Sequence, residues 1–406
     1  MRINKLNLEN IGPFKSAELE FISTDDNFEE PPVIIITGEN GTGKTVIIDA
    51  IRTLFYGVFT KIERDLTFND EFLIKANISV INETNFDLFT DSKKEDGKFK
   101  TNVTEFNKLF TGNLESIYKG PFVVDYWTSK LSNDEFGINN IEAPKTSFYL
   151  KESLTGIHRN VDVTKLITFF DYLSDSKDEK ENEIGKAFYD LIKLIIDLSI
   201  NNGILSHVSR TELIPKILIQ NQEVSLNKLS SGNLYLIQRF VVLLGQVYSA
   251  CITYKIPVSE VRNIKGLLLI DEAENHLHPK WQKVFQKNLL KIFPKLQIIV
   301  TTHSPFIVSS IENARVFVCT SDTNESFVKE ETDYYTNKPI EEILLSPLFN
   351  TSNFNEEISE LIRLRKNAIS TMNLSLAKQI EVKLLDINPN YFNFLTVEEL
   401  IKSIKK

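Results

Sequence analysis

The feature that most constrains this chain is the glycine-rich segment TGENGTGKT, residues 37–45. Val33 to Ile36, just before it, is wholly apolar, as expected of a strand buried on both faces. The segment VIIDAIRTLFYG that follows has the spacing of a helix and is expected to end at Gly57. Backbone N–H groups in a glycine-rich turn between a strand and a helix can curl around phosphate groups. The sequence therefore predicts a strand, a phosphate-binding turn and a helix.

The turn matches the P-loop pattern G-x-x-x-x-G-K-[ST], in which each residue type has its own task. The glycines let the backbone approach the phosphates, Lys44 places a positive charge near the β- and γ-phosphates, and the Thr45 hydroxyl can ligate Mg²⁺. We therefore expect ATP and Mg²⁺ to be the ligands. The residues expected to bind the nucleotide are Gly38, Asn40, Gly41, Gly43, Lys44, Thr45 and Val46.

A second motif, GLLLIDEAENHLHP, residues 266–279, places two carboxylates directly after an apolar strand. In an open α/β sheet, ligands bind at the carboxyl edge of the strands. Asp271 is expected to hold Mg²⁺, directly or through water, and Glu272 to act as the general base that polarises the attacking water. Glu274 is a rival for this role, although it lies further beyond the strand. The alternative, that these acids only end a strand, is weak beside a P-loop.

A third motif, QIIVTTHSP, residues 297–305, places His303 at the end of another apolar strand. A neutral imidazole there could hydrogen-bond the γ-phosphate or its attacking water, although a lone histidine at a strand end is more often structural. His276 and His278 raise the question of a metal, but their spacing does not put them on one helical face. No cysteine lies near them, and a zinc site needs more ligands than two histidines.

The segment LNKLSSGNLYLI, residues 226–237, pairs a Ser-Ser-Gly turn with the start of an apolar helix. The free N–H groups at such a helix start form an anion site. A simpler interpretation is that Ser230 or Ser231 only caps the helix, and the two roles are compatible. Because the segment is far from the P-loop in the sequence, it raises the question of which phosphate it contacts.

The order of apolar and polar segments predicts an α/β protein. Strands and helices alternate after residue 226, which indicates a parallel core sheet with crossover helices. The N-terminal part is expected to form antiparallel strands, with turns at Gly12-Pro13 and Asp96-Gly97. Residues 160–200 are expected to be helical with a charged break, and the tail to form a helical hairpin. The expected domains are an N-terminal ATPase lobe with the P-loop, 1–135; a helical insert lobe, 136–225; a C-terminal ATPase lobe, 226–320; and a helical extension, 321–406.

Composition narrows the class of protein. The chain has 406 residues and a formal net charge of -9, which disfavours a surface that coats nucleic acid non-specifically but leaves room for a local basic groove. Cys251 and Cys319 form no metal-spaced cluster and no disulfide framework, which fits a reducing cytoplasm. The N-terminus lacks the apolar core of a signal peptide, and the longest apolar runs are shorter than the ~20 residues of a membrane helix. We expect a cytoplasmic protein with no membrane partner.

Taken together, GENGTGKT, LSSGN, LLLIDEAENHLHP and TTHSP resemble an ABC-type ATPase of the RecF/SMC/OLD-like branch. The resemblance covers most of residues 1–320, and Asn40-Gly41 in the P-loop is typical of this branch rather than of transporters. It implies that LSSGN corresponds to the ABC signature, usually LSGGQ, which binds the γ-phosphate held by the P-loop of a second protomer. Ser230 and Gly232 match that signature, and residues 275–279 resemble the D-loop at the same interface. The resemblance therefore implies a homodimer, or a higher homo-oligomer, that forms around ATP.

The three motifs taken together favour a catalytic role for Lys44, Glu272 and His303. The chain also departs from the family. The second serine and the asparagine of LSSGN differ from the usual signature, and the glutamine that usually follows the P-loop, senses Mg²⁺ and couples to substrate is missing between Thr45 and Gln220. This absence predicts altered coupling and slow hydrolysis. The segment FVVDYWTSK stands in the expected place, and the residues that could substitute are Asp125, Thr128 and Ser129.

The LHPKWQ and TTHSPFIVSS segments most resemble prokaryotic anti-phage defence ATPases of the Septu and retron-associated PtuA type and the PARIS AriA type. We therefore expect a slow ATPase that dimerises around ATP and acts as a sensor or regulatory scaffold for an effector, which would be a nuclease or a toxin. The alternative is a RecF-like recombination or repair ATPase that clamps DNA. The P-loop style and the missing glutamine disfavour a transporter subunit. The tail has no acidic nuclease constellation, so the chain itself is not expected to be a nuclease.

Overall fold

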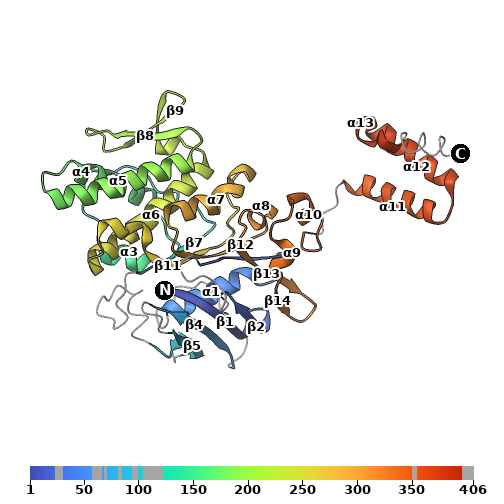
Figure 1. Cartoon of the computed structure of the whole chain (residues 1–406), viewed down its shortest axis with the longest axis horizontal. Helices are drawn as coiled ribbons and strands as arrows, with labels where there is room; N and C mark the ends of the chain where they lie inside the picture. Colours follow the sequence, from blue (N-terminus) through green and yellow to red (C-terminus); the bar gives the residue numbers. More distant parts are fainter. Residues whose placement is uncertain are drawn as a thin grey trace. The chain divides into compact units, whose positions relative to one another are not determined.

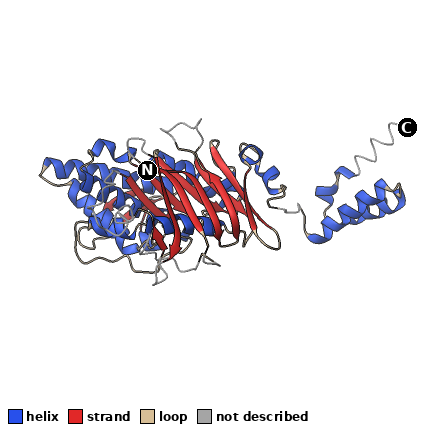
Figure 2. Cartoon of the chain, turned by 90° about the horizontal axis from the view of Figure 1, so that it is seen from below, coloured by secondary structure: helices blue, strands red, loops and turns tan. Residues whose placement is uncertain are grey.

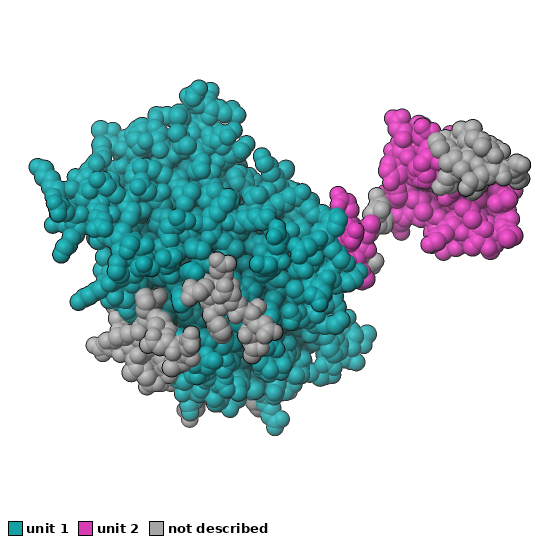
Figure 3. Space-filling view, in the orientation of Figure 1, with its two compact units in different colours: residues 1–340 teal, residues 341–406 magenta. Residues whose placement is uncertain are grey.

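The computed structural model describes residues 1–22, 31–56, 66–67, 71–80, 85–93, 99–103, 122–349 and 354–395. The chain forms two compact units, Met1–Ile340 and Glu341–Lys406, which are coloured separately in Figure 3. All of the P-loop, acidic, histidine and signature-like motifs lie in the first unit.

A six-stranded sheet forms the centre of the first unit. In order, its strands are β14 (Ser326–Glu330), β13 (Ala314–Ser321), β3 (Val33–Gly38), β12 (Leu296–Thr302), β11 (Lys265–Ile270) and β7 (Phe122–Trp127). All neighbours pair in parallel except β14, which is antiparallel to β13. Every residue of β3, β7 and β12 is buried, as expected of continuous apolar strands covered on both faces. The carboxyl ends of the parallel strands therefore meet at one edge, as the sequence predicts.

A second, antiparallel sheet is built from the N-terminal part of the chain. In order, its strands are β2 (Phe14–Glu20), β1 (Arg2–Ile11), β4 (Leu73–Ser79), β5 (Asn85–Lys93) and β6 (Phe99–Thr101). The predicted hairpin at Gly12-Pro13 is confirmed, since Ile11 pairs with Phe14. The predicted turn at Asp96-Gly97 lies outside the described residues, although β5 and β6 on either side of it pair antiparallel.

Helix α1 (Lys44–Tyr56) contacts strands of both sheets, and Figure 1 shows it between them. Figure 2 shows the strands in red and the helices in blue from another side. Every residue of α1 except Thr45 is buried, which is the pattern of a helix covered all round. The sheets are also joined directly, because the Gln297 side chain donates to Ile3 O at 2.8 Å and accepts from Ile3 N at 2.7 Å. The one residue of α1 that stays accessible is therefore the predicted Mg²⁺ ligand at its start. The predicted end of the helix, Gly57, lies outside the described residues.

A lobe of helices and a small sheet follows β7. Its helices are α3 (Thr146–Glu152), α4 (Asn160–Ser174), α5 (Glu179–Ser199) and α6 (Ser231–Tyr254). The charged break predicted within residues 160–200 is confirmed, and Asp178 caps α5 by accepting from two backbone N–H groups. The sequence analysis missed the three-stranded sheet of this lobe, which consists of β8 (Gly203–Val208), β9 (Pro215–Ile219) and β10 (Gln222–Ser225).

Helix α6 is long and apolar enough to cross a membrane by length and composition alone. However, 89% of its most apolar window is buried inside the structure, as in the core helix of a globular unit. Among the described residues no other helix passes that test.

The remaining helices of the first unit are short, apart from α7 (Pro279–Ile292), which follows the acidic motif. α8 (Pro305–Val308) follows the histidine motif, and α9 (Thr332–Tyr335) follows β14. β14 itself was not expected, because the sequence beyond residue 320 is polar. The domain boundary expected at residue 320 falls at the end of β13, yet its partner β14 belongs to the central sheet and the compact unit continues to Ile340. The other expected boundaries lie inside this unit and stay predictions.

The second unit contains α11 (Glu356–Ser370) and α12 (Leu374–Ile387), followed by the short α13 (Pro389–Phe392). The side chains of Arg365 and Glu381 link the first two helices, with Nε and Oε1 2.7 Å apart. The predicted helical hairpin is therefore confirmed. Its core consists of Ile380, Leu384, Phe392 and Leu395.

Candidate active site

The P-loop connects β3 to α1 and depends on glycine at two places. Gly38 has a φ of 148°, and a Cβ there would lie 2.2 Å from the backbone oxygen of Cys319 on β13. Gly43 has a φ of 96°, and a Cβ there would meet the ring of Phe14 at 2.6 Å. The loop can therefore take its tight path only because both residues lack a side chain.

Lys44 begins α1 with its ammonium group held over the P-loop. Its Nζ donates to Gly38 O at 3.0 Å and to Glu39 O at 2.7 Å. Burial lowers the pKa of Lys44, while the carboxylates of Glu274 and Asp271 act in the opposite direction. The structure therefore places the predicted phosphate-binding lysine close to the acids that follow β11.

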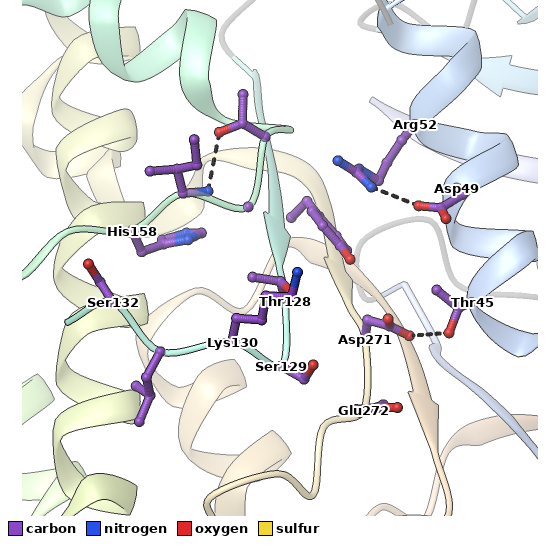
Figure 4. Close-up of a pocket in the computed structure, with 15 residues that line it drawn as sticks. Thr45, Asp49, Arg52, Thr128, Ser129, Lys130, Ser132, His158, Asp271 and Glu272 are labelled. Carbon is purple, nitrogen blue, oxygen red and sulfur yellow. Dashed lines mark hydrogen bonds and ion pairs between the residues drawn. The ribbon is translucent and has the colours of Figure 1, made fainter. Parts of the chain in front are cut away.

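Thr45 and Asp271 bring the P-loop and the acidic motif together. The Thr45 hydroxyl donates to Asp271 Oδ1 at 3.0 Å, as the dashed line in Figure 4 shows. The same oxygen accepts from Thr301 Oγ1 on β12 at 2.6 Å. Burial raises the pKa of Asp271, against the lowering effect of these two hydroxyl donors. This arrangement places two side-chain oxygens side by side, which fits the preference of Mg²⁺ for hard oxygen donors.

Glu272 follows in an unusual backbone conformation. Its φ of 52° is left-handed, a conformation that costs a non-glycine residue on the order of 1–3 kcal/mol and that clusters at functional sites. Its N–H donates to Thr301 Oγ1 at 2.9 Å, and its carboxylate accepts from the Asn275 amide at 2.6 Å. With its backbone and side chain held in this way, Glu272 lines the same cavity as Thr45.

Glu274, the rival acid, has a different set of contacts. Its carboxylate accepts from Thr302 Oγ1 at 2.7 Å and from the backbone N–H of His303 at 2.6 Å. Burial and the nearby Lys44 charge lower the pKa of His303, so its imidazole is neutral near pH 7. Glu274 thus fixes the loop that carries His303, whereas Glu272 is the acid that lines the cavity.

A cavity of about 450 Å³ opens beside Thr45, Asp271 and Glu272. Across it from these residues lie Thr128 and Ser129, two of the three substitutes considered for the missing glutamine (Figure 4). The third, Asp125, does not line the cavity, because it is fully buried. Its carboxylate accepts from the indole N–H of Trp127 and the amide of Gln246, each at 2.7 Å.

The cavity segment after β7 is held by two residues that the sequence analysis did not assign to the site. Arg239 on α6 donates to Thr128 O at 2.9 Å and to Lys130 O at 2.5 Å. His276 contacts Ser129 O through Nε2 at 2.8 Å. The only indication of Arg239 in the sequence is that it is a single cation within the apolar run LIQRFVVLLG, where a charged side chain needs a partner. These contacts link the cavity both to the signature-like helix and to the segment after Glu274.

The signature-like segment lies at the exposed start of α6. Ser230 is exposed and caps the helix, since its Oγ accepts from Asn233 N at 3.4 Å. A Cβ on Gly232 would lie 2.4 Å from His276 O, so glycine permits the close approach of these two backbones. Neither Ser230 nor Gly232 is among the described residues that line the cavity beside Thr45. The signature-like and P-loop motifs are therefore not brought together around that cavity.

The two histidines considered as metal ligands have separate partners. His276 contacts the backbone of Ser129, whereas the Nδ1 atom of His278 accepts from Lys280 N at 3.2 Å and caps α7. Among the residues that the structure describes, no group of three or more His, Cys, Asp or Glu side chains is arranged to hold a metal.

The fold and the site define a P-loop ATPase of the ABC type. One chain contains the strand, P-loop and helix, the acidic strand end in contact with the P-loop, and the signature-like helix start. The family model described as "AAA domain, putative AbiEii toxin, Type IV TA system" matches residues 33–309. Because this range covers more than half of the chain, the chain belongs to that family. It is an ATPase of the RecF/SMC/OLD-like branch, as the sequence motifs imply.

Comparison with known proteins identifies further similar chains. "Retron Vc95 probable ATPase" of Vibrio cholerae serotype O1 biovar El Tor is 22% identical over 460 residues, which cover 93% of this chain and 86% of the relative. "Septu protein PtuA" of Bacillus thuringiensis is 26% identical over 321 residues, which cover 76% of this chain and 73% of the relative. Among solved structures, the "SMC head domain from Thermotoga maritima" is 16% identical, with a TM-score of 0.44 and coverage of 82% of this chain and 99% of that chain.

Proposed function

We propose that the chain binds ATP with Mg²⁺ and hydrolyses it slowly between two copies of itself, and that this ATP-bound homodimer is a regulatory scaffold for an effector protein in anti-phage defence. One observation carries the proposal. Thr45 and Asp271 are in contact, whereas the exposed signature-like Ser230 lies outside the cavity that they line. A site divided in this way is complete only when a second copy supplies its Ser230. Relatives named for retron and Septu systems support the defence role.

Thr45 and Asp271 are the residues proposed to hold Mg²⁺. Their oxygens lie 3.0 Å apart, and burial has raised the pKa of Asp271, an effect that a cation beside the carboxylate would offset. When bound, the ion supplies positive charge to the β- and γ-phosphates. Lys44, held over the P-loop, is proposed to contact the same phosphates.

Glu272 is proposed to orient the attacking water and to accept its proton. Its backbone is fixed through Thr301, the residue that also donates to Asp271, so the base and the metal ligand keep one geometry. His303 is proposed to hydrogen-bond the γ-phosphate or the water as a neutral imidazole, positioned by Glu274. The segment FVVDYWTSK, which contains Thr128 and stands where the family usually has a glutamine, supports slow turnover because it has no glutamine.

A mixing experiment tests whether the site is shared. Lys44→Ala removes the charge of the P-loop lysine, and Ser231→Arg places a large cation on the exposed first residue of α6. Each variant alone is expected to be inactive. An equal mixture is expected to recover about a quarter of wild-type turnover per chain, because half of randomly formed two-fold dimers are mixed and each has one intact site.

Ser370→Arg, at an exposed serine of α11, is the matched control and is expected to keep full turnover by itself. If Lys44→Ala and Ser231→Arg form mixed dimers by native mass spectrometry and turnover stays absent, the signature-like segment does not act on the partner's nucleotide.

The effector role is tested by purifying Glu272→Gln protein from its native host with ATP and Mg²⁺. A nuclease or toxin in stoichiometric amount supports the scaffold. Chromosomal DNA without any effector protein would instead favour the RecF-like clamp.

A further inference from the structure

The outer face of α7 carries a row of lysines. Lys280, Lys283, Lys287 and Lys291 are all exposed, and residues three or four apart on a helix are neighbours on one face. At 1.5 Å per residue, the row extends about 16 Å along the helix. We refer to these four residues as the α7 lysine ridge; α7 is drawn in orange in Figure 1.

The opposite face of α7 fixes the ridge to the rest of the unit. Phe285 and Leu289 are fully buried, and the ring of Phe285 lies 6.2 Å from the ring of Trp127 on β7. Gln282 and Gln286 bond to Ser304 and Ser310, with oxygen–oxygen distances of 2.6 and 2.7 Å. The lysines therefore stand on a rigid element rather than on a loop.

The ridge is unusual in its charge, because the chain is acidic overall at -9. No Asp or Glu occurs between Glu274 and Glu312, so α7 has no acid of its own to balance its lysines. None of the four lysines forms an ion pair with a carboxylate within the described part of the chain; the ammonium of Lys283 lies 5.5 Å from the Phe306 ring. By contrast, other exposed lysines are paired, for example Lys15 with Glu325 at 3.0 Å. Like charges spaced three or four residues apart on a helix are destabilising, and an anionic partner would remove that cost.

We propose that the α7 lysine ridge binds the sugar–phosphate backbone of a nucleic acid. A duplex carries one charge per about 1.7 Å of its axis, so about 16 Å of helix can face enough phosphates for all four lysines. An acidic protein fits less well, since stable protein interfaces rely on buried aromatic or arginine anchors. Val284, which is 37% exposed, is the only exposed large apolar residue on α7, so the helix has no exposed aromatic or arginine anchor for a protein.

Because lysines contact phosphates as point charges, the binding is expected to be independent of base sequence. This inference goes beyond the proposed function, as it requires neither the ATP-bound dimer nor an effector. Binding at the ridge is therefore measured without ATP, and a failure there leaves the shared ATP site untouched.

The test replaces all four ridge lysines by glutamine in the full chain. The matched control replaces four lysines that have acidic partners, which gives the same change in net charge: the half-buried Lys5 and the exposed Lys15, Lys193 and Lys329. Binding of labelled duplex DNA, single-stranded DNA and single-stranded RNA of about 30 units is followed by fluorescence anisotropy over a series of salt concentrations. The three probes distinguish the source of the phosphate backbone.

For the ridge variant, the negative slope of log K against log salt is expected to become less steep, by about 3.6 for a duplex and about 2.8 for a single strand relative to wild type. The control is expected to keep the wild-type slope. Thermal unfolding and ATP turnover of both variants show that the fold is kept. Equal slopes for the two variants, or no binding of any probe by the wild type, would overturn the proposal. Loss of binding to poly-glutamate to the same extent as to nucleic acid would overturn it in favour of an acidic protein.

Discussion

The Thr45 hydroxyl and the Asp271 carboxylate lie 3.0 Å apart, although the two residues are 226 positions apart in the sequence. Topology explains this contact, because β3 and β11 flank β12 in one parallel sheet and end at the same edge. Thr301 on the strand between them donates to the same oxygen of Asp271 at 2.6 Å. The start of α1, the end of β12 and the residue after β11 thus supply one small oxygen-lined site.

Replacing Thr45 by valine is expected to abolish Mg²⁺-dependent ATP turnover. Valine keeps the branched shape of threonine but removes the oxygen that contacts Asp271, so one proposed ligand is lost while α1 stays packed. Thr45→Ser, which keeps the hydroxyl, is the control and should retain turnover. The measurement is the Mg²⁺ dependence of phosphate release at saturating ATP. Equal turnover by the valine and serine variants would remove Thr45 from the metal site.

The two acids after Asp271 are expected to respond differently to conversion to glutamine. Glu272→Gln should still bind ATP but hydrolyse it at least ~10²-fold more slowly, which corresponds to about 2.7 kcal/mol of barrier. Glu274→Gln keeps an oxygen that can accept from His303 N, so its loss of turnover should be smaller. Single-turnover rates with bound ATP compare the two variants directly. A larger loss in Glu274→Gln would assign the base to Glu274.

The unfolding free energy is expected to decrease as pH falls below about 6.5, the ordinary pKa of histidine. Burial lowers the pKa of both His158 and His303 in the folded chain, so the unfolded chain takes up protons first. The two histidines therefore contribute fully to the unfolding free energy above the pKa of histidine in the unfolded chain. This contribution is lost as the pH falls toward their lower pKa values in the folded chain. Urea unfolding at pH 7.5 and 5.5 measures the change.

His158→Gln should reduce this pH dependence, because it removes the one of these two imidazoles that is fully buried. His207→Gln, at an exposed histidine, is the control and should leave the dependence unchanged. The same dependence in wild type and both variants would show that His158 does not cause it.

The core of the central sheet could be predicted from the sequence, since β3, β7 and β12 are buried on both faces and are therefore continuous apolar runs in the sequence. Val33–Gly38 and Leu296–Thr302 are of this kind, and both end at the site. Because these strands could be predicted, the motif residues that follow them could be placed at the carboxyl edge of the sheet. The three-stranded sheet of the helical lobe could not, because its strands are short and have exposed residues. Its tight turn at Gln220-Asn221, with φ values of 49° and 64°, contains no glycine to mark it.

The contacts within the site were less predictable than its members. Nothing in the sequence shows that Glu274 bonds to the His303 loop while Glu272 faces the cavity. Arg239 is fully buried and bonds to backbone oxygens of the cavity segment, although arginine is ordinarily an exposed residue. Asp125 was considered as a substitute for the missing glutamine, because the sequence does not show that its carboxylate is buried and bonded to Trp127 and Gln246. These contacts form only in the tertiary structure.

Two glycines of the P-loop give a matched test of how its path is fixed. Both have positive φ values, 148° for Gly38 and 83° for Gly41, so alanine is strained at either position. A Cβ at Gly41 meets nothing within 4 Å, and Gly41→Ala should therefore cost only the backbone strain, on the order of 1–2 kcal/mol of unfolding free energy. A Cβ at Gly38 would lie 2.2 Å from the Cys319 backbone oxygen, which belongs to the neighbouring strand and cannot rotate away. Gly38→Ala should thus cost clearly more than Gly41→Ala in urea unfolding, because β3 and β13 must separate to accommodate it. Equal costs for the two substitutions would mean that backbone strain, and not the contact between the strands, fixes the loop.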